Sequence, residues 1–169
     1  LSNNVLKIYL VEYPVINNLF ILGEPKKAFE EQIRKIISLK NKDSFIKSNL
    51  SADIDKIKTL YSSIGYNFTT IETKVKNIDK NNIDLIYKID KGEVSKISKI
   101  FFTGDKKIRE RRLRDIIASE EDKFWKFISK NTRFSENLIN LDLRLLENYY
   151  KSIGYYDVKV SSNSAEIKK

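Results

Sequence analysis

The sequence predicts an α+β fold built from tandem repeats, each in the order β-α-α-β-β, with two antiparallel helices covering one face of a three-stranded mixed sheet. Three observations lead to this prediction. The chain matches itself at two places in the same order. Each copy passes from period-two alternation to the spacing of an amphipathic helix and back. Each second helix runs into a glycine, a residue that commonly ends helices.

The repeat has two matching segments of different spacing. Residues 16–27 resemble residues 97–107, which lie 81 positions later, and both contain alternating apolar residues followed by glycine. Residues 60–66, Leu-Tyr-Ser-Ser-Ile-Gly-Tyr, resemble residues 149–155, which lie 89 positions later. The spacing grows by eight, so we expect an insertion in the second copy, within residues 118–134.

A third match defines the predicted domain boundaries. Residues 4–12 resemble residues 82–90, the strand that ends the first complete copy. We therefore expect residues 1–12 to be the last strand of a preceding unit, 13–92 a complete unit, and 93–169 a unit lacking its final strand. The chain is expected to be a piece of a longer protein, with the last unit distorted or completed by a strand from a neighbouring chain.

Each copy is expected to open with a strand and an amphipathic helix. The strand residues Leu19 and Ile21 alternate and lead to Gly23, and Ile100 and Phe102 do the same in the second copy. Apolar residues at helical spacing follow: Phe29, Ile33, Ile36 and Ile37 in the first copy, and Leu113, Ile116 and Ile117 in the second. Pro25 is a suitable residue for the start of the first helix.

The second helix of each copy has start and stop signals. We expect Ser51 and Ser135 to cap the two helices, with Asp53 placed to oppose the helix dipole. Gly65 and Gly154 follow the last apolar residues, where a left-handed conformation needs no Cβ. The apolar stripes are Ile54, Ile57, Leu60, Tyr61 and Ile64 in one copy, and Leu138, Leu141, Leu145, Leu146, Tyr149 and Ile153 in the other.

Extended segments are expected after both glycines, at residues 66–76 and 155–161. In the complete copy a polar turn at residues 79–82 leads to a last strand. Along that strand Ile83, Leu85, Tyr87 and Ile89 alternate, which predicts one buried face.

Composition removes most catalytic chemistry. The chain has no cysteine and no histidine, which excludes thiolate nucleophiles, histidine bases and Cys/His zinc sites within it. It has no glycine-rich phosphate loop either. We expect no enzyme activity, no cofactor and no metal. The longest apolar-rich stretch, residues 15–22, is interrupted by two asparagines, so no transmembrane helix is expected.

The charge balance leaves alternatives open. There are 32 Lys and Arg against 23 Asp and Glu, a net charge of +9. Because most basic residues stand among acids, a solvated lysine-rich surface is favoured over binding to nucleic acid or anionic lipid. A KH-like nucleic-acid module shares the β-α-α-β order, but it clamps the nucleic-acid backbone with a Gly-x-x-Gly loop. Residues 39–49, where this loop would lie, contain no glycine.

The element order, the strand-Gly start and the helix end Tyr-x-x-Ile-Gly-Tyr together resemble POTRA domains. Three features are similar to the first to third POTRA units of assembly factors of the BamA family. They are the acidic and proline junction at residues 11–16, Asp-Lys-Gly at 90–92, and the aromatic insertion at 123–127 followed by Arg-Phe-Ser at 133–135. The chain departs from the family's usual Gly-Asn turn at Gly23-Glu24 and Gly104-Asp105.

The resemblance implies a non-enzymatic scaffold in the periplasm, as part of an outer-membrane protein. Its expected partners are unfolded outer-membrane proteins, accessory assembly lipoproteins, neighbouring POTRA units and a C-terminal membrane β-barrel, with no nucleic acid. Binding by β-strand addition is expected, since an edge strand offers its backbone to any extended peptide. The alternative is a POTRA module of another transporter or of a division protein.

In the family's strand order the second strand is the edge and the last strand lies in the middle. The resemblance therefore places peptide-binding edges at Asn67, Thr69, Ile71, Thr73 and Val75, and at Tyr155, Tyr156, Asp157, Val158, Lys159 and Val160. The alternative is that these strands are only protected margins, with lysines 74, 76 and 159 discouraging aggregation.

A second possible partner surface combines Arg109 and Arg112 of the basic segment 106–114 with Phe124, Trp125 and Phe127 of the insertion. Arginine and tryptophan are favoured anchors at interfaces. The alternatives are a solvated helix face for the arginines and a plug at the end of the local core for the aromatic residues.

Overall fold

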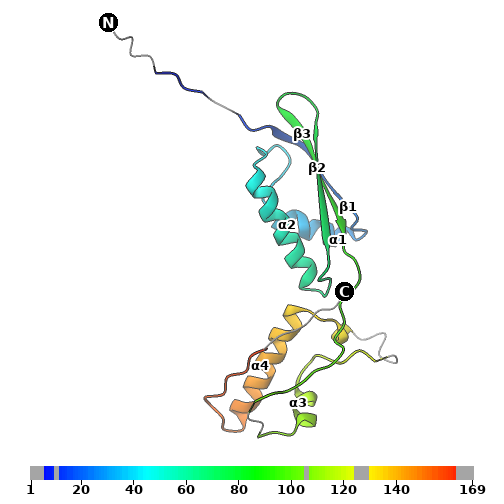
Figure 1. Ribbon diagram of the computed structural model, residues 1–169, viewed down its shortest axis with the longest axis vertical. Coiled ribbons are helices and arrows are strands. Elements are labelled where there is room, and N and C mark those ends of the chain that lie inside the picture. The colour runs from blue at the N-terminus through cyan, green and yellow to red at the C-terminus, as the bar shows by residue number, and fades with distance from the viewer. Residues whose placement is uncertain (1–5, 10–11, 105–106, 124–129, 163–169) are drawn as a thin grey trace. The chain divides into compact units, whose positions relative to one another are not determined.

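The computed structural model describes residues 6–9, 12–104, 107–123 and 130–162 (Figure 1). The chain forms two compact units, one of residues 1–57 and 71–89 and the other of residues 58–70 and 90–169. The elements are β1 (Val15–Leu22), α1 (Lys27–Ile36), α2 (Lys47–Ser62), β2 (Thr70–Asn77), β3 (Asn82–Asp90), α3 (Glu110–Ile116), the 3₁₀ turn η1 (Lys130–Thr132) and α4 (Glu136–Ser152).

The first unit contains the predicted three-stranded mixed sheet. Its strand order is β1-β3-β2, so the last strand in the sequence is the central one. β1 runs parallel to β3, with a register shift between Ile16 and Asn18, and β2 and β3 form a hairpin. α1 and α2 lie on one face of the sheet (Figure 1). This arrangement confirms the fold class expected from the sequence.

The core of the first unit lies between this sheet and the helices. All four alternating residues of β3 are buried, as the sequence predicted, because the central strand packs its whole inner face against the helices. They are joined by apolar residues of β1, of α1 and of the segments up to Ile57, namely Ile16, Leu19, Ile21, Ile33, Ile37, Leu39 and Leu50.

One helix start was predicted correctly and one was not. The Ser135 hydroxyl accepts a hydrogen bond from the Leu138 N–H at 3.3 Å, so Ser135 caps α4. Ser51 does not cap α2, which already begins at Lys47. The helix starts one turn earlier because Leu50, inside that first turn, is buried in the core. Both helices are followed by glycines with positive φ, +96° at Gly65 and +98° at Gly154, as predicted.

The second unit has α3 and α4 but no strand among its described residues. Leu113 of α3 and Leu146 of α4 are buried in it. The strands predicted around Ile100 and Phe102, and over residues 155–161, are absent. In the first unit the outer strands pair only with the central strand. Among the described residues of the second unit no central strand is present, so neither segment is paired in a sheet, although Ile97 bonds to Thr132 and Asp122 on one side.

None of the helices in the described part of the chain is long and apolar enough to cross a membrane.

Candidate peptide-binding edge of the first unit

The sheet of the first unit has two edges, and one of them is covered. The Ile16 N–H donates to the Asp43 carbonyl at 2.9 Å, and the Ile16 carbonyl accepts from the Lys42 N–H at 2.7 Å. Further along β1, the Leu19 N–H donates to the Asn41 side-chain oxygen at 2.8 Å. The backbone of β1 up to Leu19 is therefore hydrogen-bonded by the segment between α1 and α2, and another strand cannot pair there.

The other edge is β2, and it is open. In the described residues β2 has β3 on one side and no strand on the other. β2 also alternates less strictly than β3, and most of its residues are exposed. A strand in this position offers a row of unpaired N–H and C=O groups to an incoming chain.

The pairing of the hairpin indicates which backbone groups face outward. The Ile78 N–H donates to the Asn82 carbonyl at 2.9 Å, and the Glu72 carboxylate pairs with the Lys88 ammonium at 3.2 Å in the same register. Antiparallel pairing alternates at every second residue. Even-numbered residues of β2 therefore bond to β3, while Thr73 and Val75 present their N–H groups to the open edge.

The predicted edge residues separate into two groups. Ile71, Thr73 and Val75 lie in β2. Asn67 and Thr69 lie before the strand. The Asn67 side chain bonds to the Ser62 hydroxyl at 2.6 Å and the Phe134 carbonyl at 3.0 Å. The buried Thr69 hydroxyl donates to the Tyr66 carbonyl at 3.0 Å. These two residues shape the entry into β2 and offer no free edge.

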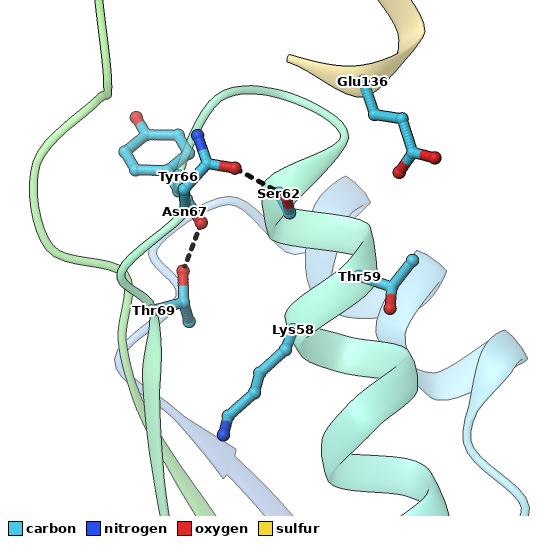
Figure 2. A pocket seen from close by; sticks show the side chains of 7 residues that line it. All are labelled: Lys58, Thr59, Ser62, Tyr66, Asn67, Thr69 and Glu136. Carbon is cyan, nitrogen blue, oxygen red and sulfur yellow. Dashed lines mark hydrogen bonds between the residues drawn. The ribbon is translucent and has the colours of Figure 1, made fainter. Parts of the chain in front are cut away.

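A polar pocket lies beside this entry, within the second unit (Figure 2). Its lining residues are Lys58, Thr59, Ser62, Tyr66, Asn67, Thr69 and Glu136. In Figure 2 the side chains carry mainly hydroxyl, amide and charged groups, with Asn67 and Thr69 held by the bonds just described. Such a lining suits a polar side chain rather than an apolar one.

The second predicted edge, residues 155–160, is not a strand in the structure. Tyr155 packs edge-to-face on Tyr150 with ring centroids 5.8 Å apart, and Tyr156 is 76% exposed. Asp157 and Lys159 are exposed, and Val158 and Val160 are partly buried. The backbone at these positions stays a predicted binding edge.

The predicted arginine and aromatic patch is described only in part. Arg112 lies over the Tyr149 ring at 5.4 Å and donates to its hydroxyl at 3.5 Å, a contact that raises the pKa of Arg112. Arg109 is exposed immediately before α3. Phe124, Trp125 and Phe127 lie outside the described residues. The arginine half is thus an exposed cationic face, partly engaged by a tyrosine.

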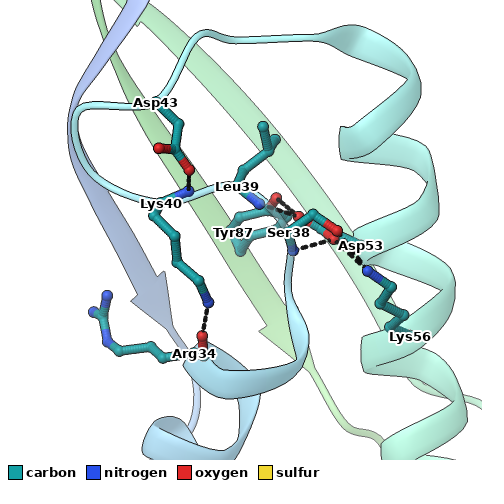
Figure 3. A network of polar contacts seen from close by, with 8 residues as sticks. All are labelled: Arg34, Ser38, Leu39, Lys40, Asp43, Asp53, Lys56 and Tyr87. Carbon is teal, nitrogen blue, oxygen red and sulfur yellow. Dashed lines mark hydrogen bonds and ion pairs between the residues drawn. The ribbon is translucent and has the colours of Figure 1, made fainter.

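Sequence reasoning missed the role of Asp53. We expected Asp53 to lie at a helix start and oppose the helix dipole. It is instead fully buried, and its carboxylate accepts hydrogen bonds from the Ser38 N–H at 2.6 Å and the Leu39 N–H at 2.9 Å (Figure 3). It also receives the Lys56 ammonium at 3.3 Å and the Tyr87 hydroxyl at 3.5 Å. The carboxylate therefore fastens the segment after α1 to α2 and to the central strand.

The second unit repeats this clamp. Asp142, 89 residues after Asp53, accepts from the Ala118 N–H at 2.7 Å and the Ser119 N–H at 3.1 Å. The same spacing of 89 separates the two helix ends, so aligning the repeats would have identified the aspartate pair. The clamp sets the position of each second helix, and in the first unit it also reaches β3.

Comparison with curated proteins finds assembly factors of the outer membrane. The chain is 25% identical over 162 residues to the outer membrane protein assembly factor BamA of Neisseria meningitidis, covering 94% of this chain and 20% of that protein. It is 26% identical over 157 residues to BamA of Neorickettsia risticii, covering 93% and 21%. The chain thus spans about a fifth of the length of these relatives.

Solved structures show the same fold. The POTRA3–5 fragment of Haemophilus influenzae BamA superposes with a TM-score of 0.52 at 18% identity, covering 85% of this chain and 52% of that one. POTRA1–2 of Omp85 from Anabaena gives 0.52 at 14% identity, covering 90% and 88%. Both are fragments made of more than one POTRA unit, so the fold of this chain is that of a POTRA protein.

The family model for POTRA, the surface antigen variable number repeat, matches residues 14–92 and again residues 95–169. The chain belongs to the POTRA family. The resemblance to the POTRA domains of BamA, first drawn from motifs, is supported by these relatives and structures.

Proposed function

We propose that this chain is a polypeptide-binding scaffold of the machinery that assembles outer-membrane β-barrels. Its first unit receives unfolded outer-membrane proteins, or docks an accessory lipoprotein, by adding an extended segment to β2. It works in the periplasm beside neighbouring POTRA units and a membrane barrel, as part of an outer-membrane protein. The proposal rests on family membership and on the contrast between the two sheet edges.

That contrast is the observation that carries the proposal. If the sheet margins were only to be protected from aggregation, both would be expected to be covered. Instead the segment 41–45 covers β1 up to Leu19, while β2 stays open and carries exposed lysines 74 and 76. Lysines on an edge discourage association with another copy of the same positively charged edge. They leave the backbone available to a partner strand.

Strand addition also fits a receiver of many clients. Backbone N–H and C=O groups are the same in every extended peptide, so the hydrogen bonds ask little of the client's side chains. Side chains next to the edge only tune the interaction.

A proline at position 75 tests the mechanism. Val75→Pro removes an outward N–H and leaves the bonds between β2 and β3 intact, since proline is tolerated on an edge strand when its nitrogen faces solvent. The matched control is Val75→Ala, which shortens the side chain and keeps the N–H. The probe is a ten-residue peptide with alternating apolar and polar residues, as found in membrane β-strands.

The proline variant is expected to bind this peptide about tenfold more weakly than the alanine variant, measured by fluorescence anisotropy, with unchanged circular dichroism. Equal affinity of the two folded variants would show that the backbone of β2 is not the binding element.

A further inference from the structure

The open edge of β2 leaves part of the apolar layer of the first unit uncovered. Odd-numbered residues of β2 lie on the helix-covered face, where Val75 stands opposite the buried Leu85 of β3. Ile71 and Thr73, on the same face, are partly buried, whereas Val75 is 44% exposed. In the described residues no further strand lies beyond β2 to cover it. An apolar side chain added beside Val75 would remove this surface from water.

The outer face of β2 carries charge instead. Even-numbered residues of the strand lie on this face, and two of them, Lys74 and Lys76, are exposed lysines. The hairpin register described above places Lys74 opposite Ile86 and Lys76 opposite Asp84. Ile86 cannot neutralise a charge, so only Asp84 stands where it could pair with one of the two lysines.

Neither lysine has an ionic partner in the part of the chain that the structure describes. The Asp84 carboxylate instead accepts from the backbone N–H and the side-chain amide of Asn18, both at 3.1 Å. Glu72, the one acid of β2, is already paired with Lys88 at 3.2 Å. The outer margin of β2 is therefore cationic at two successive outward positions.

We propose that the open edge of β2 selects extended segments in which two acidic residues flank an apolar one. Side chains alternate between the two faces of a strand. When one residue of an added segment shares the inner face with Val75, its two neighbours therefore lie on the outer face, beside Lys74 and Lys76. The apolar residue covers the exposed valine, and the two acids meet the two lysines.

This inference rests on the proposed strand addition and adds to it the chemistry of the preferred segment. The backbone bonds are common to every client, whereas the side chains opposite the edge differ between clients. Opposite charges that face each other across neighbouring strands attract, and like charges repel. Each such pair changes an affinity by up to about fivefold, and two pairs together by about tenfold.

General electrostatic attraction must be separated from a preference at β2. The chain carries a net charge of +9, so any acidic peptide is attracted to it to some extent. Peptides of equal charge that differ only in the face carrying the acids make this separation, because a shift of one position moves a side chain to the other face.

Four ten-residue peptides that alternate valine with a polar residue provide the probes. In three of them the two central polar residues are both glutamate, both glutamine or both lysine. The fourth has the composition of the glutamate peptide, but each glutamate has changed places with a neighbouring valine, so that both acids lie on the inner face. Fluorescence anisotropy with the 169-residue chain at about 50 mM salt measures their affinities.

The glutamate peptide is expected to bind about tenfold more tightly than the lysine peptide, with the glutamine peptide between them. It should also bind at least about threefold more tightly than the rearranged peptide of the same charge. The difference between the glutamate and lysine peptides should shrink at about 1 M salt, where charges on the surface are screened within about 3 Å.

Variants of the chain locate the preference. Lys74→Glu combined with Lys76→Glu should reverse the order of the glutamate and lysine peptides. The matched control combines Lys27→Glu with Lys35→Glu, which changes the net charge by the same amount on α1. Because α1 lies beside β1, and β3 separates that strand from β2, this control should keep the original order.

The outcomes distinguish this inference from strand addition itself. Equal affinities of the glutamate, glutamine and lysine peptides would overturn the charge preference and leave strand addition at β2 intact. Equal affinities of the two peptides that contain glutamate would show attraction by net charge alone, and would also overturn the preference. If no peptide bound, or if Val75→Pro left the binding unchanged, strand addition would be wrong and this inference with it.

Discussion

Gly23 shows how closely two strands approach in the first unit. Its φ of +94° belongs to the left-handed region, and the space that a side chain would need is filled by the Ile89 carbonyl. Two independent requirements, one conformational and one steric, therefore call for glycine here. Gly104 has only the conformational requirement.

Gly23→Ala is consequently expected to destabilise the first unit by about 4 kcal/mol or more, because β3 must move to admit the methyl group. Gly104→Ala, the matched control, should cost only about 1 kcal/mol, the penalty of a positive φ. Urea denaturation followed by circular dichroism measures both. Similar losses in the two variants would mean that the close approach at Gly23 does not exist.

Tyr87 is the second residue with a measurable consequence. Burial of its phenol, reinforced by the nearby Asp53 carboxylate, raises the pKa of Tyr87 above its ordinary value of 10.0. Above that pH an unfolded chain releases this proton while the folded chain retains it, so the unfolded state binds fewer protons. The contribution of Tyr87 to the free energy of unfolding is therefore fully present below pH 10, and it is lost as the pH rises further.

Tyr87→Phe removes this ionisation. Near neutral pH it should lower the free energy of unfolding by about 1 kcal/mol, because the hydrogen bond to Asp53 is lost. The free energy of unfolding of the wild type should then fall more steeply than that of the variant above pH 10.0, so that the gap between them narrows. Urea titrations at about pH 8 and pH 11 measure the gap, with the other tyrosines common to both proteins. If the free energies of unfolding of the two proteins fell by the same amount between these pH values, Tyr87 would have an ordinary pKa.

The role of Asp53 could not be predicted from its own position in the sequence. An aspartate shortly after a serine and before an apolar stripe is typical of a helix start, and the sequence favoured that role. Its true role depends on two N–H groups of a segment 14 and 15 residues away. Backbone donors leave no trace in residue identity, so only the repetition of the aspartate at position 142 could have revealed the clamp.

At the level of elements, helix starts were predicted where the capping chemistry was decisive. Ser135 precedes α4 in extended conformation and binds its third residue. Ser51 occupies a similar sequence position, yet the burial of Leu50 extends α2 by one turn beyond it. Tertiary packing therefore outweighs a local capping signal worth about 1 kcal/mol.

Ser135→Ala should destabilise the chain by about 1 kcal/mol, because the Leu138 N–H loses its acceptor. Ser51→Ala should change stability by less than about 0.5 kcal/mol, and in the favourable direction, since this exposed serine lies inside a helix where alanine is preferred. Thermal unfolding compares the two directly. A loss at position 51 as large as that at position 135 would restore Ser51 as the cap.

Strands were predictable from side-chain alternation, but the covering of the β1 edge was not. Alternation identified the buried face of β3 residue by residue. The covering of β1, in contrast, uses the backbone of Lys42 and Asp43 together with one Asn41 side chain. This irregular segment has no periodic pattern, so nothing in the sequence showed that the β1 edge is covered.

At the scale of the whole molecule, two similar sequences give two different degrees of order. Both repeats keep the aspartate clamp, the positive-φ glycine after the second helix and the packing of apolar helix faces. Only the first has a sheet, because only the first contains a central strand among the described residues. The outer strands of this fold therefore depend on the middle one for their hydrogen bonds.

Hydrogen exchange should report this difference. Amides of β1 and β3 are expected to exchange slowly, at rates set by unfolding of the unit, while amides of residues 156–160 exchange near the rate of an open chain. Mass spectrometry of peptic fragments at low protein concentration measures both regions in one experiment. Comparable protection of the second region would mean that it already forms a sheet.

The position of β3 also dictates the order in which a unit can be completed. Its central strand is the last to leave the ribosome or the translocation channel, after both helices and both flanking strands. Until residue 90 has emerged, the first unit holds two strands with no partner and a half-covered apolar layer. Each new repeat thus passes through an incompletely folded, aggregation-prone state, during which a holding chaperone would be most needed.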